Sequence, residues 1–158
     1  MLLVMRVLHI AMGVFWAGTM MFNAAFLMPA FRDAGPDGAK VAAALARRRF
    51  MEIMPWIAAL TIVSGVWLYW FDSVGFRPPF MRSRMGISLG VGALAALIAF
   101  VLGVAAMRPA MIKAMRLGQD PSQQAAAQAL RVRAGVLGRV ISALLGIAVA
   151  AMAVARYI

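Results

Sequence analysis

The stretch Met85–Met107, MGISLGVGALAALIAFVLGVAAM, has 23 residues and contains no Asp, Glu, Lys or Arg. A transmembrane helix needs about 20 mostly apolar residues to cross a hydrocarbon core about 30 Å thick. Uncharged stretches of the same kind occur at three other places: Val7–Phe31, Ile53–Phe71 and the shorter Val140–Ala155. The last one gains a helical turn from the residues before it, with Arg139 extending its charged end towards the interface.

The composition is that of a chain that lies mostly in lipid. Of the 158 residues, 65% are hydrophobic and 13% are charged, against about 45 to 50% and about 25% in soluble domains. So few charges cannot coat a globule of this size with water-facing side chains. The sequence predicts an all-α fold: a polytopic transmembrane four-helix bundle in a single integral-membrane domain, 1–158. Its spans are expected at about 7–31, 53–71, 85–107 and 137–156.

Lys and Arg are distributed unevenly between the connections. The segments 32–52 and 108–139 carry eleven of them, and the opposite side carries five. Positive residues close to span ends are retained in the cytoplasm. We therefore expect a multi-pass protein of a bacterial-type inner (cytoplasmic) membrane with both termini outside. The net charge of +11 is interpreted as belonging to membrane flanks, and no nucleic-acid partner is expected.

The two basic connections are rich in good helix formers, chiefly Ala, Leu, Arg and Gln. We therefore expect helices that extend into the cytoplasm. One should run from Ala39 into the second span, the third span should continue to about Leu117, and one helix should cover Pro121–Ala155. Kinks are expected at Pro55 and Pro109, because proline cannot donate the backbone hydrogen bond.

Chemically reactive side chains are scarce within the predicted spans. The only acid or base is His9, and the remaining polar groups are Thr19, Asn23, Thr61, Ser64, Ser88 and Ser142. A nucleophilic serine needs a base within hydrogen-bond reach, and intramembrane ion pathways usually carry carboxylates. The sequence therefore predicts no catalytic residue, favours a role without enzymatic turnover and argues against a proton or ion transporter.

His9 lies about one turn inside the first span, on the helix face that also carries Trp16, Met20 and Asn23. This face should point into the bundle. The imidazole can bond a neighbouring helix or interfacial water, or it can bind haem, another tetrapyrrole or copper. Because the chain has one His and no Cys, a second metal ligand would be water, a histidine of another subunit or a methionine such as Met85.

Small residues recur at four-residue spacing in every predicted span, in pairs such as Gly86 and Gly90 or Thr61 and Gly65. In lipid, such residues let helix backbones approach closely. The pattern predicts tight packing against an internal helix, another membrane subunit or a second copy of the chain, and leaves these alternatives open.

The run Arg47, Arg48 and Arg49 is interpreted first as a topology signal. Anionic lipid headgroups are its next expected partner, because each basic residue near a charged membrane surface contributes about 1 kcal/mol of attraction. The lipid bilayer itself is the expected partner of the uncharged stretches.

The first span, RVLHIAMGVFWAGTMMFNAAFLMPAF, resembles the opening helix of small bacterial membrane families of the copper-resistance D and protoporphyrinogen-oxidase J types. The shared positions are Leu8, His9, Trp16, Gly18 and Pro29, and the likeness extends to the second span and the start of the third. The resemblance implies haem or copper handling around His9. Those families generally offer further histidines or a helix-borne lysine, and this sequence has neither, so a relative that keeps the bundle without the redox chemistry fits it better.

Three hypotheses follow. The first is a non-catalytic accessory or structural subunit packed within a larger respiratory, photosynthetic or transport complex in the membrane. The second is a haem- or copper-handling membrane protein that uses His9 as a ligand. The third is a small enzyme of porphyrin oxidation.

Overall fold

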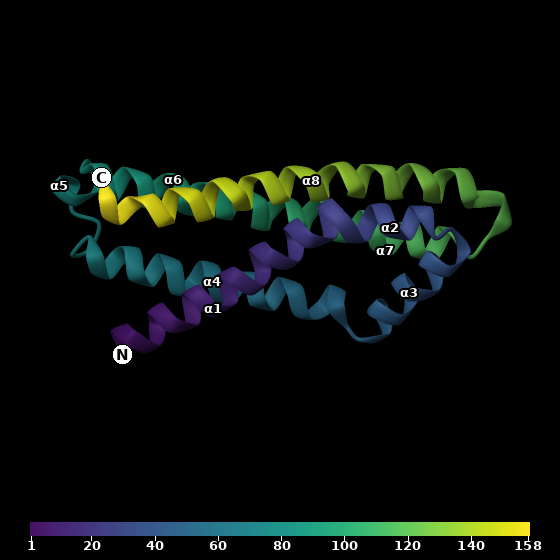
Figure 1. Cartoon of the computed structure of the whole chain (residues 1–158), viewed down its shortest axis with the longest axis horizontal. Coiled ribbons are helices and arrows are strands. Elements are labelled where there is room, and N and C mark those ends of the chain that lie inside the picture. Colours follow the sequence, from purple (N-terminus) through teal and green to yellow (C-terminus); the bar gives the residue numbers. More distant parts are fainter.

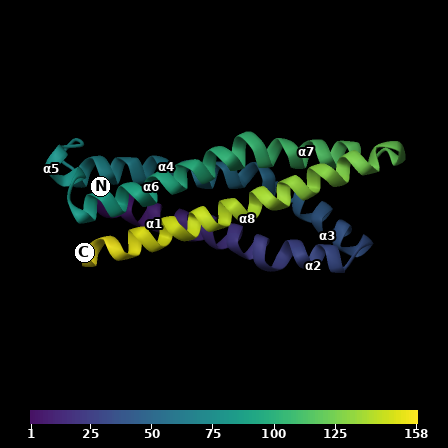
Figure 2. The same ribbon diagram turned by 90° about the horizontal axis from the view of Figure 1, so that it is seen from above.

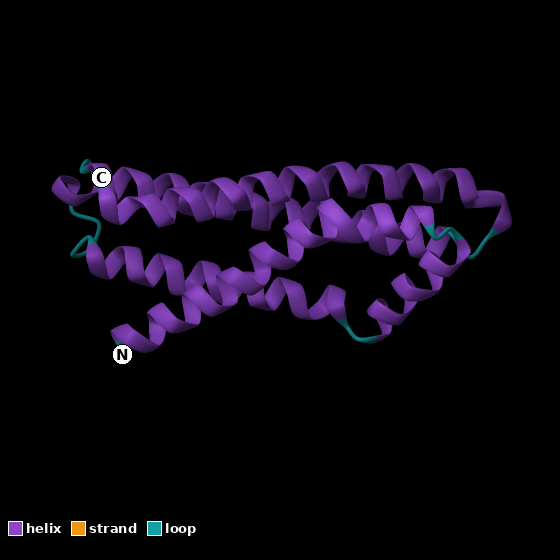
Figure 3. Ribbon diagram, in the orientation of Figure 1, coloured by secondary structure: helices purple, strands orange, loops and turns teal.

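The computed structural model describes all 158 residues apart from the side chain of Pro36, and the described chain consists of helices and short connections (Figure 3). Four helical runs are long and apolar enough to cross a membrane: Leu2–Asp33, Phe50–Asp72, Arg84–Leu117 and Pro121–Tyr157. Each run contains one of the predicted spans. The prediction of an all-α chain with four segments long and apolar enough to span a membrane is confirmed, and it fits a multi-pass protein in a lipid bilayer.

The elements follow one another in a simple order. The first run consists of α1 (Leu2–Phe22), the π-helical turn η1 (Asn23–Leu27) and α2 (Met28–Asp33). Next come α3 (Pro36–Arg47), α4 (Phe50–Asp72) and the short α5 (Pro78–Met81). The third run is α6 (Arg84–Leu102), the π-helical turn η2 (Gly103–Met107) and α7 (Arg108–Leu117). The last is the 3-10 turn η3 (Pro121–Gln123), α8 (Gln124–Val154) and the 3-10 turn η4 (Ala155–Tyr157).

The two ends of the molecule differ in what they carry. Both chain termini and α5 lie at one end, here called the terminal end; α2, α3 and the connection between α7 and α8 lie at the other, the basic end (Figure 1). Figure 2 shows α6 and α7 following α8 along its length. α1 packs on α4 and crosses it obliquely, so that its second half and η1 contact α8.

The four runs share one core of buried side chains. Its members are mostly alanines: Trp16, Ala17, Met20, Ala58, Ala95, Ala96, Ala99, Ile141, Leu145 and Ala148. Without a hydrophobic force between helices in lipid, close van der Waals contact at small residues is what holds such helices together. Trp16 is the one aromatic side chain in this core, and it fills space that alanine alone would leave empty.

Glycines on α6 and α8 form notches that receive long side chains from neighbouring helices. A Cβ atom added at Gly92 would lie 3.0 Å from Cγ of Met152 and 3.1 Å from the backbone oxygen of Ala148. On α8, looser contacts of this kind join Gly138 to Met107 and Gly146 to Met21, where an added Cβ atom would lie 3.9 Å and 3.6 Å from the methionine. These methionines therefore serve packing, for which their flexible side chains are well suited.

The predicted glycine pair of the third span faces an internal helix. The hydroxyl of Tyr69 on α4 donates to the backbone oxygen of Gly86 at 3.1 Å. A Cβ atom added at Gly90 would lie 3.7 Å from the same hydroxyl. Both glycines therefore have contacts within the chain.

Pro109 widens the third run without breaking it. Its missing N–H and its ring disturb the regular bonding pattern, and the π-helical turn η2 absorbs the disturbance: the backbone N–H of Arg108 bonds to the oxygen of Gly103. Pro29 follows η1 in the same way. The predicted continuation of the third span to Leu117 is confirmed.

The fourth run begins at a capped turn. Asp120 accepts hydrogen bonds from the hydroxyl of Ser122 at 2.7 Å and from its backbone N–H at 2.9 Å. These two bonds hold the pKa of Asp120 below its usual value. The predicted continuous helix over Pro121–Ala155 is confirmed except that its first turn is 3-10 and its α-helical part begins at Gln124.

The prediction of one helix from Ala39 through the second span is wrong. α3 ends at Arg47 and α4 begins at Phe50, because Arg49 adopts a left-handed backbone conformation with φ of 59°. A left-handed residue ends the α-helical bonding pattern. The two helices are therefore separate elements at the basic end (Figure 1).

Gly92→Ala should destabilise the contact between α6 and α8, because its methyl group meets a backbone oxygen that cannot move freely. The expected loss is about 1 to 3 kcal/mol, as for other overpacked sites. Gly18→Ala is the control, since a Cβ atom there has no neighbour within 4 Å. Thermal unfolding of the purified protein in a mild detergent measures both. If the Gly92→Ala protein unfolds at the same temperature as the wild type, the tight packing inferred at Gly92 is wrong.

Candidate functional site

The side chain of His9 lies against α4 and is partly buried. Its Nδ1 atom is 2.9 Å from the backbone oxygen of Thr61. The hydroxyl of Ser64 is 3.4 Å from the same nitrogen, but it donates its hydrogen to the backbone oxygen of Leu60 at 2.6 Å. The prediction that His9 faces a neighbouring helix is confirmed.

The bond to Thr61 decides which ring nitrogen of His9 carries the proton. A carbonyl oxygen only accepts hydrogen bonds, so Nδ1 must be the donor. In a neutral imidazole the other nitrogen, Nε2, then has no hydrogen and presents a lone pair. The side chain is thereby held as one tautomer, with Nε2 as its acceptor atom.

Nε2 of His9 is open to the surroundings of the protein. The bonds of this side chain within the described chain all involve Nδ1. Apart from the Pro36 side chain, which is not described, no buried side-chain nitrogen or oxygen lacks a partner. Nε2 must therefore reach the surface, where it meets lipid, water, another chain or a bound group.

Gly65 fixes the position of the imidazole ring. A Cβ atom added there would lie 2.6 Å from Cε1 and 3.0 Å from Nδ1 of His9. One turn along α1, a Cβ atom at Gly13 would lie 3.4 Å from Cγ2 of Thr61. The predicted small-residue pair Thr61 and Gly65 thus allows α1 to approach α4, and the ring of His9 occupies the space that Gly65 leaves.

An ion pair lies on the side of His9 nearer the terminal end. Arg6, three residues before His9, pairs with Asp72 at the end of α4, with 3.3 Å between Nη2 and Oδ1. This carboxylate is the only acid near that part of α4 in the sequence. Asp72 is therefore engaged by the guanidinium of Arg6, while the imidazole takes a backbone oxygen.

The structure does not pair Met85 with His9. Met85 is an exposed residue in the first turn of α6, and α6 packs on α8 and α4, whereas α1 packs on α4 and α8. Another methionine near the terminal end, Met152, fills the notch at Gly92. Within the described chain no group of three His, Cys, Asp or Glu side chains is placed to hold a metal ion.

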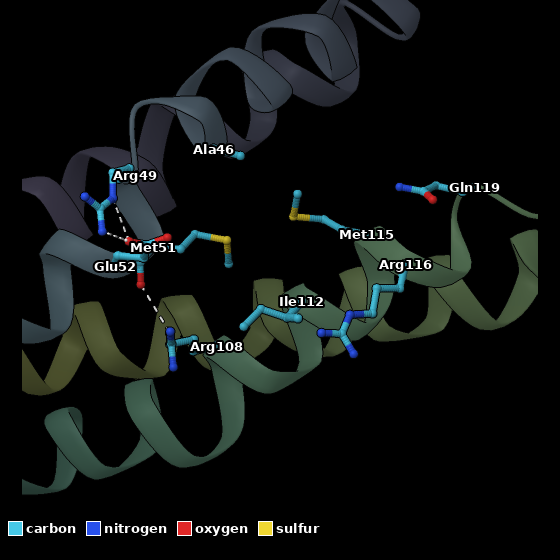
Figure 4. A pocket seen from close by; sticks show the side chains of 9 residues that line it. All are labelled: Ala46, Arg49, Met51, Glu52, Arg108, Ile112, Met115, Arg116 and Gln119. Carbon is cyan, nitrogen blue, oxygen red and sulfur yellow. Dashed lines mark hydrogen bonds and ion pairs between the residues drawn. The ribbon is translucent and has the colours of Figure 1, made fainter.

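A second site lies at the basic end. A cavity of about 310 Å³ opens between the start of α4 and α7 (Figure 4), and it is lined by Ala46, Arg49, Met51, Glu52, Arg108, Ile112, Met115, Arg116 and Gln119. Three arginines face one glutamate there. Arg49 belongs to the basic run for which lipid headgroups are an expected partner, whereas no sequence pattern pointed to the two arginines of α7.

Arg108 occupies its place in this cavity because of a proline on another helix. Its Nε atom donates to the backbone oxygen of Met51 at 3.2 Å. Four residues later in α4 stands Pro55, which has no N–H to bond that oxygen. Arg108 supplies the missing donor. Pro55 was the signal that such a donor was needed, although the sequence does not say which residue provides it.

Comparisons with known proteins add no information on function to that given by these residues. No family model, no curated protein and no solved structure matches the chain.

Gly65→Ala should displace the imidazole of His9 and lower the stability of the contact between α1 and α4 by about 1 to 3 kcal/mol. In a His9→Ala background the same substitution should cost little, because the ring that it meets is gone. The difference is a coupling energy, expected at about 0.5 to 3 kcal/mol for residues in contact. Thermal unfolding of the four proteins in detergent measures it, and strictly additive losses would show that the two residues do not touch.

Proposed function

We propose that the protein is a non-catalytic integral-membrane subunit, a four-helix bundle that packs within a larger membrane complex. The observation that carries the proposal is the open Nε2 atom of His9. The buried residues of α1 are Trp16, Ala17 and Met20, so no residue in the first half of α1 is fully buried, although this half carries the acceptor. A polar atom left unpaired in hydrocarbon costs several kcal/mol, and a donor from water or from another molecule removes that cost.

The rest of this half of α1 suits contact with lipid or with another membrane helix. Leu3, Val7, Ile10 and Val14 follow one another at helical spacing and are 73%, 58%, 62% and 67% exposed. Lipid chains cover such a stripe without any partner. The imidazole is the feature that lipid chains do not satisfy, and it is therefore the part of this surface that supports a protein or cofactor partner.

A haem- or copper-handling role is the second candidate, and the bond between His9 and Thr61 favours it. Histidines that bind metals usually donate their other ring N–H to a carbonyl or carboxylate, which fixes the tautomer and orients the ring. His9 has this arrangement, with Nδ1 donating and Nε2 free. Nε2 would hold haem, another tetrapyrrole or copper, which would supply electron-transfer or group-carrying chemistry. The first span resembles the copper-resistance D and protoporphyrinogen-oxidase J types, which implies haem or copper handling around His9, but the chain lacks their further histidines and helix-borne lysine.

His9→Ala tests both candidates, because it removes the one side chain on which each depends. For a subunit, native gel electrophoresis of solubilised membranes should show the wild type in a band well above its 17.0 kDa and the variant in a smaller one. For a haem or copper protein, the purified wild type should absorb visible light and contain iron or copper, and the variant should lose both. Val91→Ala, which trims an exposed apolar residue of α6 away from α1, should change neither measurement.

The outcomes separate the candidates. A large assembly without pigment or metal supports the subunit alone, and a coloured monomer supports the cofactor alone. A wild type that is monomeric in its native membrane, colourless and free of metal would overturn both.

The orientation in the membrane is also part of the proposal. The basic end carries most of the Lys and Arg, so we place it in the cytoplasm of a bacterial-type inner membrane, with helices extending beyond the bilayer and both termini outside. Arg47, Arg48 and Arg49 would then lie where anionic lipid headgroups are found. All three are exposed.

Reporter fusions check this orientation. After Tyr157, a reporter enzyme that is active only outside the cytoplasm should be active, and one that is active only in the cytoplasm should be inactive. In the connection between α7 and α8, the two reporters should give the opposite result. The prediction follows from the excess of positive residues at the basic end. A cytoplasmic location of the fusion after Tyr157 would mean that the orientation is inverted or that α8 does not cross.

A further inference from the structure

We propose that the cavity between α4 and α7 binds a phosphate group, carried either by the headgroup of an anionic phospholipid or by a soluble phosphate ester. The inference rests on the proposed placement of the basic end at an anionic membrane surface. The sequence predicts a contact between anionic lipid and the run Arg47, Arg48 and Arg49. The cavity is a different and smaller site, and of these three arginines only Arg49 lines it.

The charges that line the cavity are not balanced within it. Its single carboxylate, Glu52, is taken by Arg49 at 2.6 Å. Arg108 and Arg116 line the same cavity, and in the described chain neither takes part in an ion pair. Two guanidinium groups on one helix face therefore present N–H groups to the cavity. Guanidinium is the side-chain group best shaped to bind phosphate oxygens in pairs.

One of these arginines is already held in position. Arg108 is partly buried, and its Nε atom is fixed to the backbone oxygen of Met51. Its Nη atoms stay free for a ligand while the plane of the group is set. A positioned donor loses less conformational freedom when the ligand binds, which favours affinity.

Apart from Gln119, the remaining walls of the cavity are apolar. Met51, Ile112, Met115 and Ala46 lie beside the arginines (Figure 4). Arg108 directly follows the uncharged stretch Met85–Met107, so the cavity opens where the third run leaves its apolar part. A phosphate attached to an apolar body matches both kinds of wall, and this favours the phospholipid as the natural source of the phosphate.

The test uses the full chain, purified in a mild detergent and titrated with phosphatidylglycerol, with bound lipid counted by native mass spectrometry. Arg116→Gln should weaken binding about tenfold, the equivalent of the roughly 1.5 kcal/mol of one hydrogen bond to a charged group. Lys113→Gln is the matched control: it removes the same charge from the same helix, and Lys113 is exposed and does not line the cavity. It should leave the affinity unchanged.

Arg108 needs a variant that keeps the fold, because Arg108→Gln also removes the donor to Met51. Combining it with Pro55→Ala restores a backbone N–H within α4 for that oxygen. The double variant Pro55→Ala/Arg108→Gln should melt near the wild type and still bind phosphatidylglycerol at least as weakly as Arg116→Gln, while Pro55→Ala alone should bind normally.

Two soluble probes separate the sources of the phosphate. Glycerol 3-phosphate or inorganic phosphate that competes with phosphatidylglycerol in an Arg116-dependent way indicates a soluble ester, and no competition indicates a lipid; both outcomes support the site. Phosphatidylglycerol binding that needs Arg47 and Arg48 but not Arg108 or Arg116 overturns the cavity and leaves the lipid contact standing. No preference for phosphatidylglycerol over phosphatidylcholine, together with no binding of either soluble probe, overturns both.

Discussion

Close approach of helix backbones at small residues is the constraint on which this structure depends. Lipid chains are as apolar as leucine, so burying a large apolar side chain between membrane helices gains little, and contact between well-fitted surfaces must hold them. The core accordingly uses Ala95, Ala96 and Ala99 on α6 and Ala148 on α8. Two larger side chains occupy space that a glycine leaves: Met152 at Gly92 and His9 at Gly65. The helices are therefore closely spaced at these contacts, and a single methyl group added there should lower the stability of the fold.

Much of the architecture could be predicted from the sequence, because membrane spans are set by composition over many residues. The four spans, the extension of the third run to Leu117 and the inward face of α1 all follow from that signal. The break at Arg49 does not, since its surroundings, ARRRFMEI, contain neither Gly nor Pro. The conformation of a single residue decides that break. The amino-acid composition favours helix on both sides of Arg49 and therefore does not predict the break.

The two sites differ in how far they could be predicted from the sequence. The spacing of His9 from Trp16 and Met20 was enough to place it on the packed face of α1. Its partner was not predictable, because the acceptor is the backbone oxygen of Thr61, and every residue has such an oxygen. The cavity at the basic end was harder to predict from the sequence than the site at His9. Arg108 and Met51 are 57 positions apart in sequence, and only the fold brings them together.

α4 is the element that connects both sites. Side chains of two other helices donate to its backbone: His9 of α1 at Thr61 and Arg108 of α7 at Met51. The two acceptors are ten residues apart, or about 15 Å along a helix, so one bond lies at the start of α4 and the other at its middle. The acceptor at Met51 is free because Pro55 cannot donate, and the one at Thr61 is reachable because Gly65 has no side chain. In an environment where apolar contact is weakly directional, these two bonds, together with that of Tyr69 to Gly86, fix the position of α4 along its neighbours. The first two bonds also leave nitrogen atoms unused: Nε2 of His9 and the Nη atoms of Arg108.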